Sequence, residues 1–531
     1  MPTRGGCQSE DVVTRRNTVL CGLFVAAFLI TSPSASLAQA PAAPAAKADA
    51  EASQVKELWY AVLIGGKKSG WSRSTVTTTK DEIRSEQEMT FTIKRENATM
   101  TLSTTTEFIE HADGSAKSMR AVQSMGSDPT ETLFEFTKDG VKLTTITKNA
   151  RQTTMLPMPA GEWLTPSRVE TFILKSIKEG KKEFSYATIS PTSGTTIVTE
   201  SRTQIASGEG KFGDKTVKTY SYDVKNSAAP TIPIRETIDE FGDLVNQRME
   251  TGAFTIVTTK TTKEKALADV NAPEIMVGTY IVPHKPLPRS NQLTKATYIL
   301  RTPDGEAPAV ATTSAQSVTP EGERSVRVVI SVDAKTPANL SPEQRSAALA
   351  ATTLADAKDA EIVRLVEKAT KDVGPDPAKR AEAMRRFVHS YIKKKDLSVG
   401  FASASETARS AAGDCSEHGV LLAAMLRADK TPARAVSGLV HVPGLAKGKG
   451  AFGYHLWTQA LLTIDGVECW VDLDATLSAT SRFDASHIAL VVSDLADNDT
   501  MTSMVSIVPL LGRLSIDVIE TTPAQEKPDA K

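Results

Sequence analysis

A period-two alternation of apolar and polar residues runs through the first half of this chain and constrains its fold more than any other feature. Residues 89–93, Met-Thr-Phe-Thr-Ile, have the pattern of a strand with one buried face. Asp-Gly at 139–140, between two further alternating runs, indicates a tight hairpin turn. Within this first half, only residues 165–180 have the apolar spacing and end signals of a helix. Residues 55–272 are therefore predicted to form a mostly antiparallel β domain with one helix.

The N-terminal residues have the composition of a secretory signal peptide. An arginine pair at 15–16 precedes an apolar run at 19–30, and small residues follow. The run is shorter than the roughly 20 residues that a membrane span needs. We therefore expect residues 1–40 to be a signal peptide and residues 41–54 to be an Ala/Pro-rich linker. The mature protein is expected to be exported, periplasmic or secreted, without a transmembrane anchor.

The charge and the cysteine content of the 531-residue chain argue against two classes of protein. A formal net charge of -1, with no basic stripe, argues against a nucleic-acid-binding protein. Of the four cysteines, Cys7 and Cys21 lie in the predicted leader, which leaves Cys415 and Cys469. Two cysteines in so long an exported chain do not form a disulfide framework, although the sequence leaves open a single bridge between them.

The second half of the chain has a mixed pattern. Residues 273–340 begin with a proline-rich stretch, and we expect them to form a connector with a short β segment. Apolar residues then recur at helical spacing over 362–369 and 381–391. We expect a single domain over residues 341–520 and a polar tail over residues 521–531.

The segment Gly-Asp-Cys-Ser-Glu-His-Gly at 413–419 is the strongest indication of chemistry in the chain. Asp414 can cap a helix, and Glu417, three residues later, completes a start that resembles a capping box. Cys415 then lies in the first helical turn, where exposed amide groups and the helix dipole favour the reactive thiolate. The alternative is an inert core thiol, because cysteine is often buried. The cap and the segments that follow favour a functional Cys415.

Two further segments supply partners for such a thiol. His455 lies in a predicted strand, and a turn at 465–466 separates this strand from a second one that ends near Asp474. A hairpin of this kind places His455 and Asp474 on neighbouring strands. A thiol nucleophile needs an imidazole to take its proton, and the imidazole needs a group that fixes its tautomer and orientation. Asp472 lies on the same strand face and is an alternative to Asp474 in that role.

Together these segments resemble the transglutaminase-like superfamily over residues 355–490. Its members have a cysteine near a helix start, a stretch that residues 427–434 match, a His-x-Trp strand and an Asp-Pro-Thr-like strand end. This chain has Ala475 where proline is common. The resemblance implies an α+β, papain-like domain in which helices pack on an antiparallel sheet.

The same resemblance implies a catalytic triad with Cys415 as nucleophile, His455 as base and Asp474 as the orienting carboxylate. We therefore expect an exported thiol acyltransferase or hydrolase that acts on protein or peptide amide bonds, with a primary amine or water as acceptor and without a cofactor or metal. A cysteine protease of the same fold would use the same acyl-enzyme, so the motif does not separate the two. A non-catalytic envelope binding protein is the alternative from a different class.

Other residues near these segments are interpreted as structural. His418 is expected to pack beneath the site, because a zinc site needs further ligands. His487 and Cys469 are expected to be packing residues, and Trp457 is expected to lie in the core. The lysine run at 393–395 is expected to be a solvated helix end.

Overall fold

The computed structural model describes residues 54–212, 215–288, 290, 292–497 and 507–524. The predicted signal peptide and all but the last residue of the predicted linker lie outside these residues, as does the end of the predicted tail. Among the described residues, none of the helices has the length and apolar character that crossing a membrane requires.

The first half of the chain forms one sheet of 14 strands, in which every neighbouring pair is antiparallel. Strands β1 to β8 follow one another from the centre to one edge, and β14 to β9 lead to the other edge, so β1 pairs with β14. The strands are β1 (Gln54–Ile64), β2 (Lys67–Thr78), β3 (Glu82–Arg95), β4 (Ala98–His111), β5 (Ala116–Met125), β6 (Thr130–Thr137), β7 (Gly140–Ile146), β8 (Arg151–Leu156), β9 (Glu183–Ser190), β10 (Gly194–Phe212), β11 (Lys215–Asn226), β12 (Ile234–Asp239), β13 (Leu244–Glu250) and β14 (Thr255–Thr261).

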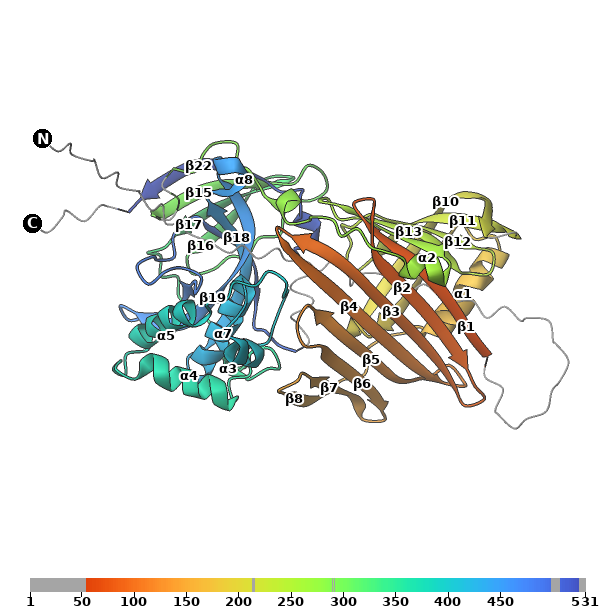
Figure 1. The fold of residues 1–531 in the computed structure, drawn as a ribbon, viewed down its shortest axis with the longest axis horizontal. Helices are drawn as coiled ribbons and strands as arrows, with labels where there is room; N and C mark the ends of the chain where they lie inside the picture. The colour runs from red at the N-terminus through yellow and green to blue at the C-terminus, as the bar shows by residue number, and fades with distance from the viewer. Residues whose placement is uncertain (1–53, 213–214, 289, 291, 498–506, 525–531) are drawn as a thin grey trace, which may run out of the picture.

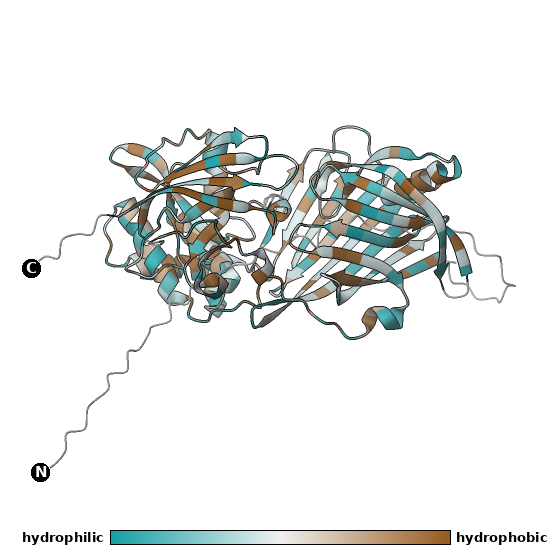
Figure 2. Ribbon diagram, turned by 90° about the horizontal axis from the view of Figure 1, so that it is seen from above, coloured by the Kyte–Doolittle hydropathy of each residue, from teal (hydrophilic) through white to brown (hydrophobic). Residues whose placement is uncertain are grey.

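The period-two pattern of the sequence accounts for this sheet. In β3, alternate residues from Gln87 to Arg95 are buried, as expected of a strand with one face against a core. Figure 2 shows polar and apolar residues alternating along the strands of the large sheet. The predicted helix is α1 (Pro166–Lys178), whose Val169 and Ile173 are buried and whose Phe172 packs edge-on against Phe184. The predicted mostly antiparallel β fold is confirmed, but the predicted range holds a second, short helix, α2 (Lys263–Leu267), which packs on β1 and β2.

The second half combines helices with two four-stranded antiparallel sheets, which confirms the predicted α+β class (Figure 1). One sheet has the order β16-β17-β15-β22 and the other has the order β20-β19-β18-β21. The strands are β15 (Leu293–Arg301), β16 (Gln316–Gly322), β17 (Ser325–Ser331), β18 (Ala433–Val442), β19 (Ala451–Ile464), β20 (Val467–Leu473), β21 (His487–Ser493) and β22 (Ser515–Pro523). The helices are η2 (Val277–Thr279), α3 (Pro342–Leu349), α4 (Ala360–Thr370), α5 (Pro377–Tyr391), α6 (Ala404–Ser410), α7 (Cys415–Ala428), α8 (Leu445–Gly448) and η3 (Val508–Leu510).

Helix α7 is the centre of this second half. All of its residues from Cys415 to Arg427 are buried, and it packs on β19, where Thr458 Oγ1 donates a hydrogen bond of 2.8 Å to the Gly419 carbonyl. A helix that is buried on every side belongs to a domain core. The core helix and the hairpin of β19 and β20 therefore form one packed unit.

The two halves of the chain lie against each other (Figure 1). The segment between α5 and α6 packs on the end of β5, where the Gly400 amide donates a hydrogen bond of 2.6 Å to the Met125 carbonyl. At the neighbouring Gly126, φ is +81°, and a Cβ atom would lie 2.1 Å from the Ser398 carbonyl oxygen. The backbones approach so closely there that only glycine fits.

Candidate active site

The nucleophile candidate Cys415 is the first residue of α7, as the sequence predicted. The side chain of Asp414 accepts a hydrogen bond from the Ser416 amide at 3.0 Å, and Glu417 Oε2 accepts one from the Asp414 amide at 2.7 Å. The second bond, with one from the Glu417 backbone amide to the Asp414 side chain, forms the predicted capping box. The thiol of Cys415 therefore starts from a backbone position where amide groups point outward from the helix.

His455 on β19 and Asp474, just beyond the end of β20, form a buried hydrogen-bonded pair. His455 Nε2 lies 2.9 Å from Asp474 Oδ2. The other oxygen of Asp474 accepts from the amide and the hydroxyl of Thr476 at 2.8 and 2.7 Å, which orients the carboxylate. His455 Nδ1 has no hydrogen-bond partner among the described residues. Because an ionised carboxylate only accepts, the imidazole carries its proton on Nε2 and presents a lone pair at Nδ1.

Asp474, and not Asp472, is the carboxylate that contacts His455. Asp472 Oδ1 instead accepts hydrogen bonds from Trp457 Nε1 at 2.7 Å and from Gln459 Nε2 at 2.8 Å. Burial raises the pKa of Asp472. The net pKa of Asp474 is well below its ordinary value. Burial alone would raise this pKa, but the adjacent His455 and His487 lower it by more. Of the two carboxyl groups, Asp474 therefore loses its proton more readily.

His487, which the sequence suggested was a packing residue, is a second histidine on the same carboxylate. Its Nε2 lies 3.3 Å from Asp474 Oδ2, and its Nδ1 lies 3.3 Å from Asp484 Oδ1. Burial lowers the pKa of His487, but hydrogen bonds to the two carboxylates outweigh it and raise the pKa to about 9. The sequence places Asp484 three residues before His487 but contains no signal that His487 contacts Asp474.

His455, Asp474 and His487 also have the separation of a metal-binding group. Their potential ligand atoms all lie within 4.8 Å of one another. Both histidines, however, already face one carboxylate oxygen, and a metal ion there would displace the bond that sets the His455 tautomer. The ring nitrogens that face Asp474 are therefore already engaged in hydrogen bonds.

A further histidine and a lysine lie at the start of α7. His418 Nδ1 donates to the Asp414 carbonyl, and Lys395 Nζ donates to His418 Nε2 at 2.8 Å. Burial lowers the pKa of His418 to about 4, so this ring is neutral and accepts at Nε2.

Lys395 differs from the solvated helix end that the sequence predicted. The residue is exposed, but burial around its ammonium group lowers its pKa. The negative charges of Asp474 and Cys415 act in the opposite direction. Both groups are therefore within electrostatic reach of one ammonium group.

The three predicted catalytic side chains are all buried. Cys415 and His455 are 0% exposed, and Asp474 is 1% exposed. Both described cysteines are thiols, so no bridge joins Cys415 to Cys469. The arrangement offers a thiol at a helix start, an imidazole lone pair and a fixed carboxylate. All three side chains are shielded from solvent in this structure.

Three solved structures are similar to parts of the chain. A beta-barrel-like protein of DUF1849, a domain of unknown function from Brucella abortus, has 11% identity over 39% of this chain and 95% of its own, with a TM-score of 0.30. A putative cysteine protease from Cytophaga hutchinsonii has 14% identity over 44% of this chain and 90% of its own, with a TM-score of 0.25. The periplasmic domain of TgpA from Pseudomonas aeruginosa, bound to ethylmercury, has 12% identity over 38% of this chain and 91% of its own, with a TM-score of 0.25.

No curated protein matches the chain. The transglutaminase-like superfamily matches residues 364–475, a range that runs from within α4 to just past Asp474 and contains Cys415 and His455. Residues 364–475 of this chain therefore form a domain of the transglutaminase-like superfamily.

Proposed function

We propose that this chain is an exported thiol acyltransferase or hydrolase that acts on protein or peptide amide bonds. Cys415 is the nucleophile, His455 is the general base and Asp474 fixes the imidazole. The observation that carries the proposal is the hydrogen bonding of His455, whose Nε2 lies 2.9 Å from Asp474 Oδ2 while Nδ1 has no hydrogen-bond partner among the described residues. A base for a thiol needs such an available lone pair. Export rests on the leader composition of residues 1–40.

In the first half-reaction, His455 Nδ1 takes the thiol proton of Cys415, and the thiolate attacks the carbonyl carbon of the amide. The carbonyl oxygen becomes an oxyanion, for which we assign the Cys415 backbone amide as donor. When the C–N bond breaks, the imidazolium returns the proton to the leaving amine. The product is a thioester on Cys415.

In the second half-reaction, His455 takes a proton from the acceptor, which attacks the thioester carbonyl and releases Cys415. A primary amine as acceptor gives an isopeptide or other new amide, whereas water gives a carboxylic acid. Both outcomes use the same three side chains, so accessibility to water and the acceptor site decide between them.

The test is incubation of the purified protein with a glutamine-containing peptide and a labelled primary amine. Incorporation of the amine indicates a transglutaminase, and new peptide N-termini indicate a protease. Cys415→Ala should abolish either product. Cys469→Ser is the matched control, because Cys469 is buried on β20 and pairs with Leu462, seven residues along β19 from His455. A product that persists in Cys415→Ala would contradict the proposed nucleophile.

A non-catalytic envelope scaffold is the second candidate, and the burial of Cys415 and His455 favours it. A buried thiol that never meets a substrate needs only to pack well. The two functions are separated by a library of electrophilic peptides. An enzyme forms adducts on Cys415 that depend on peptide sequence and on His455, whereas a scaffold forms none that depend on either.

A further inference from the structure

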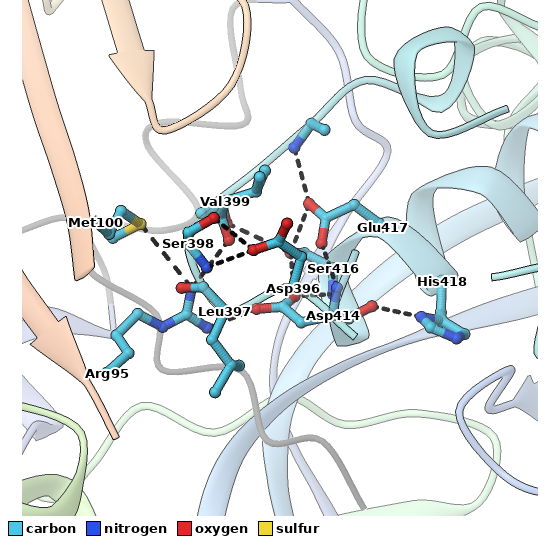
Figure 3. A network of polar contacts seen from close by, with 12 residues as sticks. Arg95, Met100, Asp396, Leu397, Ser398, Val399, Asp414, Ser416, Glu417 and His418 are labelled. Atoms are coloured by element: carbon cyan, nitrogen blue, oxygen red, sulfur yellow. Dashed lines mark hydrogen bonds and ion pairs between the residues drawn. The ribbon is translucent and has the colours of Figure 1, made fainter. Parts of the chain in front are cut away.

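The N-terminal sheet contributes a charged side chain to the start of the helix that carries Cys415. Arg95 is the last residue of β3 and is 0% exposed. Its Nη2 lies 2.5 Å from Oδ2 of Asp414, although the two residues are 319 positions apart in sequence (Figure 3). Asp414 is also fully buried and directly precedes Cys415. The first half of the chain therefore contacts the residue next to the proposed nucleophile.

The same guanidinium holds a segment of the second half. Arg95 Nη1 donates to the carbonyl oxygens of Leu397 and Val399 at 3.2 and 3.0 Å. These residues belong to the 396–402 segment, which joins α5 to α6 and lies against the first turn of α7 (Figure 3). One side chain therefore bridges the N-cap of α7 and the backbone that lies against it.

The 396–402 segment contacts α7 directly as well. The Ala402 amide donates to Glu417 Oε1 at 2.8 Å, and the Ser416 hydroxyl lies 3.4 Å from the Gly400 carbonyl oxygen. Glu417 is the second member of the capping box. A displacement of this segment would therefore be transmitted to the first turn of α7, where Cys415 lies.

The charges around Asp414 show why a cation is needed there. Asp414 and Glu417 are two buried carboxyl groups in one helical turn. Burial, followed by the charge of Asp414, raises the pKa of Glu417 well above its ordinary value, so Glu417 takes up a proton more readily. Arg95 Nη2 contacts the Asp414 carboxylate directly and compensates its charge. Without Arg95, that charge would disfavour a second negative charge on the neighbouring sulfur.

We propose that Arg95 is a positioning residue for Cys415, so that the N-terminal sheet is an integral part of the catalytic unit. Arg95 compensates the charge of Asp414 and holds the 396–402 segment against the start of α7. The inference rests on the proposed function, because it assigns Arg95 to the reactivity of the Cys415 thiol. The charged or titratable groups linked to Cys415 through its neighbours are Lys395, on which both Cys415 and Asp474 act, and Arg95, Glu417 and His418, which contact Asp414. His455 joins this set through its hydrogen bond to Asp474.

The experiment measures the rate at which iodoacetamide alkylates Cys415, followed by peptide mass spectrometry from acidic to alkaline pH. The full mature chain carries Cys469→Ser so that Cys415 is its one thiol. The variants are Arg95→Met, Arg95→Lys, and Arg95→Met combined with Asp414→Asn, which keeps a helix-capping side chain. Arg202→Met is the matched control, because Arg202 is also buried and pairs with Glu200 and Glu236 at 3.0 and 2.8 Å, but within the N-terminal sheet.

We expect Arg95→Met to move the midpoint of the alkylation profile upward by about one pH unit and to slow alkylation at neutral pH about tenfold. Asp414→Asn added to Arg95→Met should return the midpoint toward that of the parent, because it removes the uncompensated charge. The midpoint of Arg95→Lys should lie between those of the parent and Arg95→Met. An ammonium group can pair with Asp414 but does not reach the carbonyl groups of both Leu397 and Val399. Arg202→Met should lower the melting temperature without moving the midpoint.

Suppose that Arg95→Met and Arg95→Lys have the same alkylation profile as the parent, while His455→Ala is alkylated more slowly. This result would overturn the role of Arg95 and leave the proposed function intact. Alkylation that is slow in the parent and unchanged in His455→Ala would overturn the proposed function, and the role of Arg95 with it. If Arg95→Met does not fold, as judged by circular dichroism, Arg95→Lys and the double variant decide the question. Failure of the double variant to restore the midpoint would contradict the charge compensation.

Discussion

His487 Nε2 lies 3.3 Å from Asp474 Oδ2, the same carboxylate oxygen that lies 2.9 Å from His455 Nε2. One carboxylate oxygen therefore contacts two imidazoles, and the ring of His487 also contacts Asp484 through its other nitrogen. The raised pKa of His487, about 9, keeps that ring protonated at neutral pH. We expect His487 to hold Asp474 ionised and in place while His455 exchanges its proton.

The first prediction concerns stability and pH. The pKa of His487 is raised from 6.5 to about 9, so its contribution is fully present below pH 6.5 and is lost as pH rises through about 9. The shift corresponds to about 3 kcal/mol at most. Urea unfolding of the parent and of His487→Gln should therefore differ most near pH 6 and converge above pH 9. A difference that is constant across this range would show that His487 is not charged in the folded protein.

The second prediction separates the two neighbouring aspartates. Asp474→Asn replaces the acceptor of the His455 proton with a group that also donates, which favours the wrong tautomer, so turnover should fall on the order of 10³–10⁴-fold. Asp472→Asn keeps an oxygen that accepts from Trp457 and Gln459, so turnover should fall less than about tenfold. The comparison uses the amine-incorporation or hydrolysis assay under saturating substrate. The reverse order of the two variants would assign the orienting role to Asp472.

The third prediction concerns the lysine beside the thiol. Lys395 donates to His418 and lies within electrostatic reach of Cys415 and Asp474, so Lys395→Met removes a cation that favours the thiolate. Iodoacetamide labelling of Cys415 at pH 7 should slow by about three- to tenfold. Lys393→Met, in the same lysine run and exposed, is the matched control and should not change the rate. Equal rates in both variants would mean that the ammonium group does not act on the sulfur.

The fourth prediction concerns the backbone that brings the strands of the site together. Gly438 on β18 pairs with His455 on one side and with Ala489 on the other. A Cβ atom there would lie 2.2 Å from the Ile488 carbonyl oxygen, so Gly438→Ala should force β21 away and destabilise the protein by about 1–3 kcal/mol.

Gly444→Ala serves as the control for this measurement, because a Cβ atom there meets no atom within 4 Å. It should change the free energy of unfolding by less than about 1 kcal/mol. Equal effects of Gly438→Ala and Gly444→Ala in urea unfolding would show that β18 and β21 have room to separate.

Local signals made much of the site predictable from sequence. The capping box depends on two residues three positions apart, Asp414 and Glu417, and the helix begins where that spacing predicts. The hairpin depends on the turn at Asp465-Gly466, where both residues have positive φ. Because these signals act within a few residues, one sequence is enough to predict α7, β19 and β20.

The remaining contacts depend on tertiary packing. Asp472 and Asp474 are two residues apart, so the sequence pattern places both on the same face of one strand. In the structure β20 ends at Leu473, and the hydrogen bond from Thr476 to Asp474 in the turn that follows orients Asp474 toward His455. Arg95 reaches Asp414 across 319 residues, and no local pattern distinguishes it from other strand arginines. Strand β22, near the end of the chain, pairs with β15 and completes a four-stranded sheet. Because this pairing joins distant parts of the sequence, residues 273–340 were predicted only as a connector with a short β segment.

The central claim is that Cys415 and His455 form one proton-transfer pair. The most direct measurement is the pH at which Cys415 begins to react with iodoacetamide, in the Cys469→Ser chain with and without His455→Ala. An unactivated thiol reacts with a midpoint near pH 8.5, about the ordinary cysteine pKa. We predict a midpoint clearly below this value in the parent and a return toward it in His455→Ala. Two superimposable profiles with midpoints at or above the ordinary value would contradict the claim.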